Sequence, residues 1–150
     1  YLYNELATGR YMVDGRPAAL QNIRVPTFVV GTERDHVAPW QSVYKIHYLT
    51  NSTVTFILAS GGHNAGIISE PGRPRRHYRM ATRDRDQHCL DPERWAEQAP
   101  VKQGSWWEEW GRWLAAHSTE GPVKASAALG KKDGIHAPIM DAPGDYVLQR

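Results

Sequence analysis

Two short runs of apolar and β-branched residues constrain the fold of this chain more than any other feature. The first spans Val25 to Val30 and is followed by Gly31, and the second spans Thr53 to Leu58 and precedes Gly61 and Gly62. The first run has no polar alternation and predicts a strand that is buried on both faces, as in a parallel sheet. Because a helix-like segment separates the two runs, the sequence predicts a right-handed parallel strand–helix–strand unit and an α/β fold.

The segment between the two predicted strands, "PWQSVYKIHYLT", carries two signals of a helix. Pro39 suits a first helical turn, because the N–H group that proline lacks would have no partner there. Trp40, Val43, Tyr44 and His47 recur at spacings of three and four residues and therefore share one face. We predict an amphipathic helix over this segment.

A second amphipathic helix is predicted in "GSWWEEWGRWLAAHS". Ser105 and Glu108 have the spacing of a capping box, which is typical of a helix start. The residues that share the apolar face are mostly aromatic: Trp106, Trp110, Trp113, Leu114 and His117. We predict that this aromatic stripe packs in the core, where burial of each tryptophan contributes on the order of a few kcal/mol.

The remaining segments predict a division of the chain into three parts. Residues 1–20 form a connecting segment, residues 21–118 form the α/β core, and residues 119–150 form a flexible tail that ends in the short motif "APGDYVLQR". Within the core, residues 70–104 are rich in Pro, Gly and charged residues and predict loops. The first residue is Tyr1 rather than Met, which indicates a fragment or a processed chain.

Composition narrows the classes of protein. A chain of 150 residues is long enough for one domain with a core. Its net charge of +2 is too small to indicate a nucleic acid or an anionic membrane as a partner. We predict no transmembrane segment and no secretory signal. The single cysteine, Cys89, fits a reducing cytoplasm, and the seven histidines form no metal-binding motif, so we predict neither a metal nor a cofactor.

An acid and a histidine follow the two predicted strands. Asp35 comes after the first strand and His63 after the second, so both side chains are expected at the same sheet edge, where α/β folds place their sites. An acid followed by a histidine matches the later part of the α/β-hydrolase order of nucleophile, acid and histidine. In such a triad the histidine is the general base, and the acid orients it and stabilises the imidazolium. Asp35 and His63 are therefore candidate catalytic residues.

Simpler interpretations remain open for these residues. Asp35 has the position of a cap for the following helix, and His63 has that of a surface turn residue after a Gly-Gly pair. His36 is a candidate accessory group, with a solvated or structural role as the alternative. No G-x-S-x-G motif is present. The nucleophile should precede the acid, but Ser60 comes after Asp35 and so does not fit the order. Cys89 comes after His63, and we interpret it as an incidental thiol in a loop. If a triad exists, we expect its nucleophile upstream of Tyr1.

Three stretches resemble the C-terminal part of polyhydroxyalkanoate synthases, most closely those of class I. They are "NIRVPTFVVGTERDHVAPWQSVYK", "VTFILASGGHNAGIISEPG" and "GSWWEEWGRWL". The opening "YLYNELATGRYMVDGRPAAL" and the closing "APGDYVLQR" are also similar to that family, whereas residues 121–140 are the least similar. D-H-x-x-P-W followed by G-H-x-A-G and G-S-W-W is more specific than a lone Asp or His.

The resemblance implies an α/β-hydrolase fold with an inserted cap, from which residues 1–20 would return. It implies a Cys–His–Asp triad that polymerises (R)-3-hydroxyacyl groups from coenzyme A thioesters and releases coenzyme A. Asp35 matches the aspartate of that triad and His63 its histidine, whereas the cysteine would precede Tyr1 and is not Cys89. The implied partners are the acyl-CoA substrate, a polyester granule surface and a possible second copy in a homodimer, in the cytoplasm.

Some features depart from the family or admit another reading. Asn64 stands where the family more often has an apolar residue, which bears on the acyl-chain preference more than on the chemistry. The six arginines between Arg73 and Arg85 predict a solvated loop, or contacts with coenzyme A phosphates. The aromatic stripe could instead face a polymer granule. A serine esterase or depolymerase, or a non-catalytic granule-associated protein, are the alternatives to the synthase.

Overall fold

The computed structural model describes residues 3–119, 121, 134–135 and 137–149. The chain divides into two units, Tyr1–Ser118 and Thr119–Arg150. In the second unit the described residues include a short 3₁₀ helix, Asp145–Leu148. The flexible tail predicted for residues 119–150 lies largely outside the described residues.

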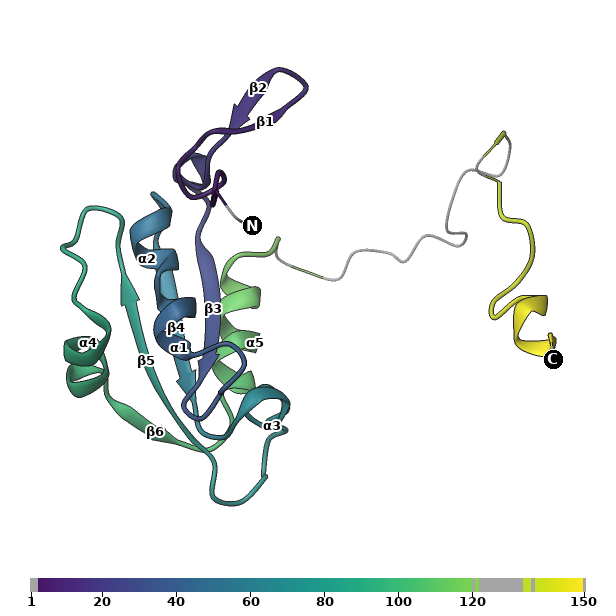
Figure 1. Ribbon diagram of the computed structural model, residues 1–150. Coiled ribbons are helices and arrows are strands. Elements are labelled where there is room, and N and C mark those ends of the chain that lie inside the picture. The colour runs from purple at the N-terminus through teal and green to yellow at the C-terminus, as the bar shows by residue number, and fades with distance from the viewer. Residues whose placement is uncertain (1–2, 120, 122–133, 136, 150) are drawn as a thin grey trace. The chain divides into compact units, whose positions relative to one another are not determined.

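The first unit is built on a four-stranded sheet with the order β3-β4-β5-β6 (Figure 1). The strands span Thr27–Thr32, Val54–Ala59, His77–Arg83 and Val101–Gln103. β3 and β4 are parallel, with Thr27 opposite Val54 and Thr32 opposite Ala59, whereas β5 and β6 continue the sheet in antiparallel fashion. The predicted α/β class and the parallel pairing of the two apolar runs are therefore confirmed.

The first strand begins two residues later than predicted. Val25 is 68% exposed and stays outside the ladder, which opens with the Thr27 N–H donating to the Thr53 carbonyl at 2.9 Å. Pro26, between them, has no N–H to contribute to a ladder. Burial on both faces was predicted for this first strand, but in β3 only Gly31 and Thr32 are buried, whereas all six residues of β4 are buried.

The helix predicted between the strands is broken into two. α1 spans Trp40–Tyr44 and α2 spans Ile46–Leu49, and Lys45 between them has 3₁₀-like backbone angles (ψ −15°). Pro39 is the N-cap, with extended ψ of 133°, and not the first helical residue. The predicted apolar face is correct in part, because Tyr44 and His47 are buried while Trp40 and Val43 are half-buried against the same core.

The stretch 70–104, predicted to be loops, contains β5, β6 and the helix α4, Pro92–Gln98. That prediction was wrong because arginines in β5 do not require solvent. Arg79 donates to the Ala99 carbonyl at 3.0 Å, and Arg83 donates to His47 Nδ1 at 3.1 Å. Burial and the neighbouring Arg83 charge lower the pKa of His47 to about 4, so the ring accepts this bond in its neutral form.

Helix α4 has a start signal that the sequence analysis overlooked. Asp91 is its N-cap, with a side-chain oxygen that accepts from the Arg94 N–H at 2.8 Å, and Pro92 occupies the first turn. Trp95, on this helix, is buried against the sheet.

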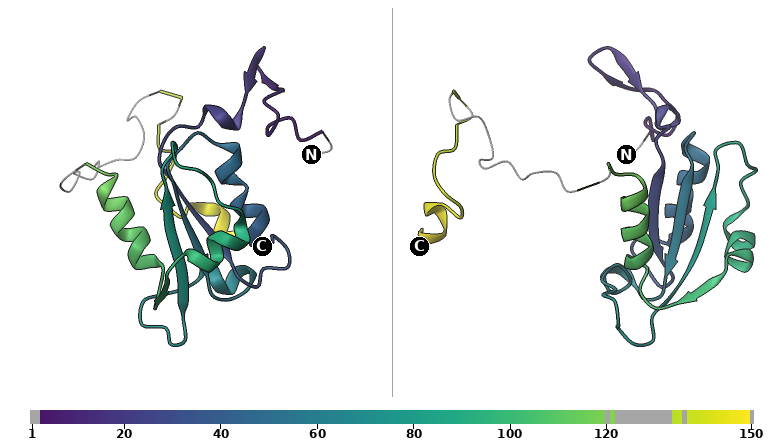
Figure 2. Two further views of the ribbon diagram at one scale, coloured as in Figure 1. Left: turned by 90° about the vertical axis from the view of Figure 1, so that its left-hand side faces the viewer. Right: turned by 180° about the vertical axis from the view of Figure 1, so that it is seen from behind.

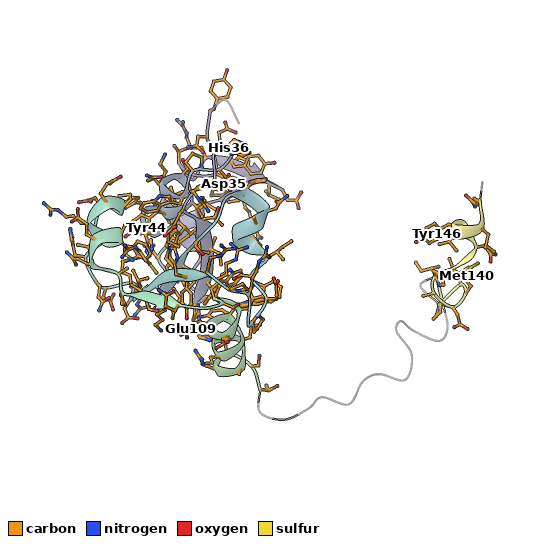
Figure 3. The ribbon with its side chains drawn as sticks, turned by 90° about the horizontal axis from the view of Figure 1, so that it is seen from below. Asp35, His36, Tyr44, Glu109, Met140 and Tyr146 are labelled. Atoms are coloured by element: carbon orange, nitrogen blue, oxygen red, sulfur yellow. The ribbon has the colours of Figure 1, made fainter. Side chains whose placement is uncertain are left out.

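Helices cover both faces of the sheet (Figure 2). On one face, α1, α2 and α4 enclose a cluster formed by Tyr44, Val54, Phe56, Leu58, Trp95 and Ala99. On the other, the α5 side contributes Trp106 to a cluster with Ile57, Ala59 and Tyr78. Figure 3 shows the side chains from below, with Tyr44 on the α4 side and Glu109 on α5.

Helix α5 spans Trp107–Ala116 and begins one residue later than the capping box requires, because Trp106 and not Ser105 is its N-cap. The Ser105 hydroxyl accepts from the Trp107 N–H at 3.0 Å, and Glu108 lies 3.6 Å from Arg112 instead of reaching back to Ser105. The predicted capping box is therefore not formed. The aromatic stripe is core only in part, because Trp106 is buried while Trp110 and Leu114 are about two-fifths exposed.

The predicted connecting segment contains a hairpin beyond the amino end of β3 (Figure 1). Its strands are β1, Tyr11–Val13, and β2, Arg16–Ala18, and a one-turn 3₁₀ helix, Leu20–Asn22, follows. The turn residues Asp14 and Gly15 both have positive φ, at 47° and 73°, as a two-residue hairpin turn requires. Among the described residues, no helix combines the length and apolarity needed to cross a membrane.

Candidate functional site

The loop after β3 presents Asp35 at the carboxyl edge of the parallel strand pair. Asp35 Oδ1 accepts from the backbone N–H groups of Val37 and Ala38, at 2.9 Å each. The carboxylate thus shapes the turn that leads into α1. Asp35 was considered as a cap for the following helix. Its side chain does accept backbone hydrogen bonds, but from the N–H groups of the loop and not from those of the first turn of α1.

The second loop presents His63 as the first residue of α3, His63–Ile67. Gly61, with φ +115°, and the N-cap Gly62 lead the chain from β4 into this helix. A side chain at Gly62 would approach the Arg34 carbonyl oxygen to 3.1 Å, so the two loops lie close together. Both leave the same end of the sheet (Figure 1).

Asp35 and His63 are in direct contact. His63 Nδ1 lies 3.1 Å from Asp35 Oδ1 and 3.0 Å from Oδ2. The Asp35 side chain is 11% exposed and that of His63 is 49% exposed. When Nδ1–H donates to the carboxylate, Nε2 of the neutral ring carries a lone pair. The half-exposed imidazole can therefore accept a proton from a hydroxyl or thiol group brought to it.

The surroundings of Asp35 favour its ionised form. The Ala38 N–H lowers the pKa of Asp35 most, and His63 and the Val37 N–H lower it further, while partial desolvation opposes them. A carboxylate that stays ionised keeps the His63 ring in one tautomer and stabilises its protonated form.

Close packing beneath the pair determines the position of α3. A Cβ atom added at Gly66 would lie 2.7 Å from Thr32 Cβ and within overlap distance of Thr32 Cγ2. Thr32 is the last residue of β3, three residues before Asp35. Only glycine at position 66 therefore allows the helix of His63 to approach the strand that leads to Asp35.

Other candidate residues lie apart from this contact. His36 is exposed and makes no hydrogen bond within the part of the chain that the structure describes. Ser60 is buried, and its hydroxyl accepts from the His77 N–H at 3.1 Å. Cys89 follows the end of β5 that pairs with the start of β4, at the opposite sheet edge from His63, and its thiol donates to the Leu90 carbonyl at 3.3 Å.

Sequence analysis missed a second histidine–carboxylate pair at the same edge. His77 Nε2 lies 3.2 Å from Glu33 Oε1, and Arg76 donates to the Ser60 carbonyl at 3.2 Å. Both contacts depend on the antiparallel pairing of β5 with β4. Residues 70–104 were predicted to be loops, so the sequence did not predict this pairing. Within the described residues, no group of three or more His, Cys, Asp or Glu side chains could hold a metal ion.

Comparison with known proteins identifies relatives. The chain is 37% identical over 139 residues to poly(3-hydroxyalkanoate) polymerase 2 of Ectopseudomonas oleovorans, covering 92% of the chain and 23% of that protein. It is 34% identical over 148 residues to poly(3-hydroxyalkanoate) polymerase subunit PhaC of Cupriavidus necator, covering 98% of the chain and 24% of that protein. The PhaC subunit of Rhizobium etli is 29% identical over 150 residues, covering 100% of the chain and 22% of that protein.

No protein-family model matches the chain. It spans about a quarter of the length of the curated relatives it matches. The similarity nevertheless extends over nearly all of its residues and includes the segments that carry Asp35 and His63. Over nearly its whole length, the chain is thus related to one segment of the poly(3-hydroxyalkanoate) polymerases.

Proposed function

We propose that this chain is the C-terminal part of a polyhydroxyalkanoate synthase with an α/β-hydrolase fold, in which Asp35 and His63 are the acid and base of a Cys–His–Asp triad. The observation that carries the proposal is the contact of His63 Nδ1 with both Asp35 oxygens, at 3.0 and 3.1 Å, at the carboxyl edge of parallel strands. The similarity to polymerases over nearly the whole chain supports it.

In the proposed first step, His63 Nε2 takes the proton of an upstream cysteine thiol. The thiolate attacks the thioester carbonyl of an (R)-3-hydroxyacyl-CoA, the bond to the coenzyme A sulfur breaks, and the leaving thiolate takes the proton from His63. Asp35 stabilises the imidazolium while it exists.

In the proposed second step, the polyester grows by one unit. His63 Nε2 takes the proton of a 3-hydroxyl group, and the oxygen attacks an acyl-cysteine thioester, forming an ester and returning the cysteine sulfur as a thiol. The proposed partners are the acyl-CoA substrate, the growing polyester and its granule surface, and a second copy of the protein, in the cytoplasm. The chain by itself has an acid and a base and is proposed to be inactive; coenzyme A release by the purified chain would contradict this.

The test is made in the full-length protein that contains this chain. We expect His63→Asn to reduce coenzyme A release from (R)-3-hydroxybutyryl-CoA by about 10²–10⁴-fold, since a general base contributes that much. Asp35→Asn should also reduce it, because the ring then loses its orienting carboxylate. His36→Asn is the matched control, because His36 is exposed and makes no hydrogen bond in the described residues. Full activity of His63→Asn would contradict the proposal.

A serine hydrolase is the alternative that shares the acid–histidine pair. It differs in the nucleophile, so the coding sequence upstream of Tyr1 discriminates: a cysteine at the nucleophile turn supports the synthase, and a serine supports an esterase or depolymerase. Inactivation of the full-length protein by iodoacetamide but not by a fluorophosphonate would give the same answer. A reading frame that starts near Tyr1 would favour a non-catalytic granule-associated protein.

A further inference from the structure

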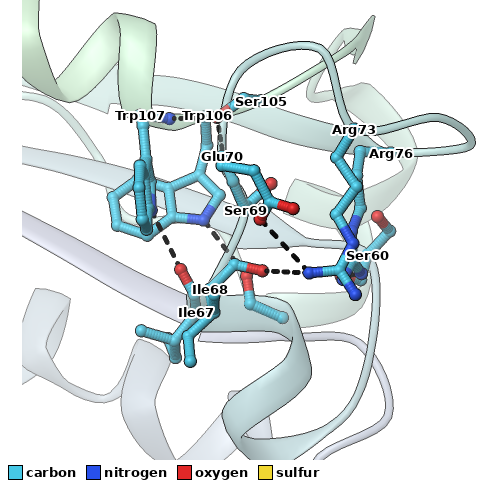
Figure 4. A network of polar contacts seen from close by, with 11 residues as sticks. Ser60, Ile67, Ile68, Ser69, Glu70, Arg73, Arg76, Ser105, Trp106 and Trp107 are labelled. Carbon is cyan, nitrogen blue, oxygen red and sulfur yellow. Dashed lines mark hydrogen bonds and ion pairs between the residues drawn. The ribbon is translucent and has the colours of Figure 1, made fainter.

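Three consecutive residues before and at the start of α5 donate hydrogen bonds to the end of α3 and the segment after it (Figure 4). The Trp106 indole N–H donates to the Gly66 carbonyl at 3.1 Å, and the Trp107 indole N–H donates to the Ile67 carbonyl at 2.9 Å. The Ser105 hydroxyl donates to the Ser69 carbonyl. We name Ser105, Trp106 and Trp107 the indole clamp.

The carbonyls that the indole clamp binds are those that a helix cannot satisfy itself. The last four carbonyls of an α-helix have no intrahelical partner, and a helix of five residues has little stability of its own. Gly66 and Ile67 are the last two residues of α3, and His63 is its first. Donors at positions 106 and 107 therefore stabilise a helix that carries the candidate base at its other end.

The indole clamp is itself firmly attached to the sheet. Ser105 and Trp106 are 5% and 7% exposed, and the Trp106 ring stacks on Phe28 of β3 with centroids 6.3 Å apart. One turn into α5, Glu109 accepts from the Tyr78 hydroxyl of β5 at 3.1 Å. The indole clamp therefore fixes α3 relative to the sheet.

We propose that Trp106 and Trp107 are positioning residues for His63: their indole N–H groups hold α3 so that the imidazole stays against Asp35. This inference rests on the proposed function of His63. The two carbonyl contacts and the close packing of Gly66 on Thr32 both restrict the same short helix. Because His63 is half-exposed, little besides α3 and Asp35 holds its ring in place.

The experiment removes one N–H group and keeps the ring. In the full-length protein, Trp107 is replaced by 3-benzothienylalanine, which has the shape of tryptophan with sulfur in place of the N–H; Trp107→Phe is the second variant. Trp110 is the matched control, because it lies on the same helix and its indole makes no hydrogen bond in the described part of the chain. Hydrogen exchange of peptides that cover residues 63–69 and the kinetics of coenzyme A release are measured for each.

We expect exchange in residues 63–69 to become about fivefold faster in the Trp107 variants, as for the loss of one hydrogen bond. We expect kcat to fall by about threefold to tenfold with KM unchanged, because the base is held less well in its reactive geometry. The 3-benzothienylalanine replacement at Trp110 keeps the ring packed against Trp106, with centroids 6.1 Å apart, and should change neither quantity. Unchanged exchange would overturn the clamp, and faster exchange with an unchanged kcat would overturn its role in positioning His63.

The two proposals fail in different ways. Full activity of His63→Asn would remove the proposed function, and faster exchange in the Trp107 variants would still be measurable in that case. Loss of activity in His63→Asn together with unchanged exchange and kcat in the Trp107 variants would leave the proposed function in place and overturn the clamp alone.

Discussion

A single carboxylate performs two tasks at the residue scale. Asp35 accepts from two backbone N–H groups of its own loop and from the ring of His63, 28 residues away. The two backbone N–H groups hold the carboxylate in one orientation, and in that orientation the carboxylate binds the His63 ring. The local hydrogen bonds therefore order Asp35 independently of its contact with His63.

The two tasks can be separated by titration. In His63→Ala, we expect the pKa of Asp35 to rise because one favourable partner is lost, yet to stay below its ordinary value because the Ala38 and Val37 N–H groups remain. The measurement is the ¹³C side-chain carboxyl shift of labelled aspartate and glutamate as a function of pH. Glu70 is the control, since its pKa is lowered by its own backbone N–H and by Arg73 and should not respond. An Asp35 pKa above the ordinary aspartate value would contradict the role of the loop.

Gly66 is the second residue whose identity the structure requires. We expect Gly66→Ala to destabilise the protein by about 1–3 kcal/mol, as overpacking does, and to lower activity by displacing α3. Gly111→Ala in α5 is the control: a Cβ there meets nothing within 4 Å, and alanine should stabilise the helix by about 0.5–1 kcal/mol. Both variants are made in the full-length protein, where chemical unfolding and the rate of the proposed coenzyme A release are measured. Equal effects of the two substitutions would refute the close-packing argument.

At the scale of elements, one carboxylate makes the polar contacts between α5 and the sheet, beside the packing of Trp113 on Phe28. Glu109 accepts from the Tyr78 hydroxyl at 3.1 Å and pairs with Lys102 and Arg112, each at 2.8 Å. The Lys102 contact contributes most to lowering the pKa of Glu109 to about 2, and Arg112 and Tyr78 add to it. Burial, and then Glu109 itself, raises the pKa of Tyr78 to about 12.

The attachment of α5 predicts an acid-dependent stability. The pKa of Glu109 is lower in the folded state, so its stabilisation is present above about pH 4.5 and is lost as the pH falls towards 2. We expect Glu109→Gln to lower stability at pH 7 by about 1–2 kcal/mol and to flatten the acid loss. Glu108→Gln should change stability by less than about 0.5 kcal/mol, because its carboxylate is exposed and, among the described residues, pairs only with Arg112, at 3.6 Å. Thermal unfolding between pH 2 and 7 measures this, and identical profiles for the two variants would contradict it.

At the scale of the whole molecule, the sheet has a free edge in the described residues. β3 pairs with β4 on one side, and no described strand pairs with its other side. Exposed apolar side chains occur near the carboxyl end of the sheet and on α5: Ile67, Ile68, Trp110 and Leu114. A strand edge and apolar surface of this kind favour association between copies.

We therefore expect the purified 150-residue chain to self-associate or aggregate. Light scattering coupled to gel filtration, over a range of concentrations, is the measurement. The full-length protein serves as the comparison and should scatter less per mass at equal concentration. A monodisperse monomer that unfolds sharply and reversibly would count against the expectation.

The sequence predicted the features that depend on local pattern. Two uniformly apolar runs indicated two neighbouring parallel strands, and the residues after them, Asp35 and His63, were expected at one edge and lie in contact there. The predicted start of the first strand was less accurate, because Val25 and Pro26 resemble strand residues but lie outside the ladder. β5 was missed because arginines that donate to buried carbonyls look the same in sequence as arginines in solvent.

The sequence by itself determined the parallel strand pair and the acid and histidine that follow it, because strand burial and loop position are set by residues next to one another. Only the tertiary structure decided what holds those residues in place. Trp106 and Trp107 each bond to carbonyls 40 residues earlier, and Glu33 pairs with a histidine 44 residues later. Such contacts join surfaces that meet only after the sheet has formed, so no local pattern in the sequence predicts them.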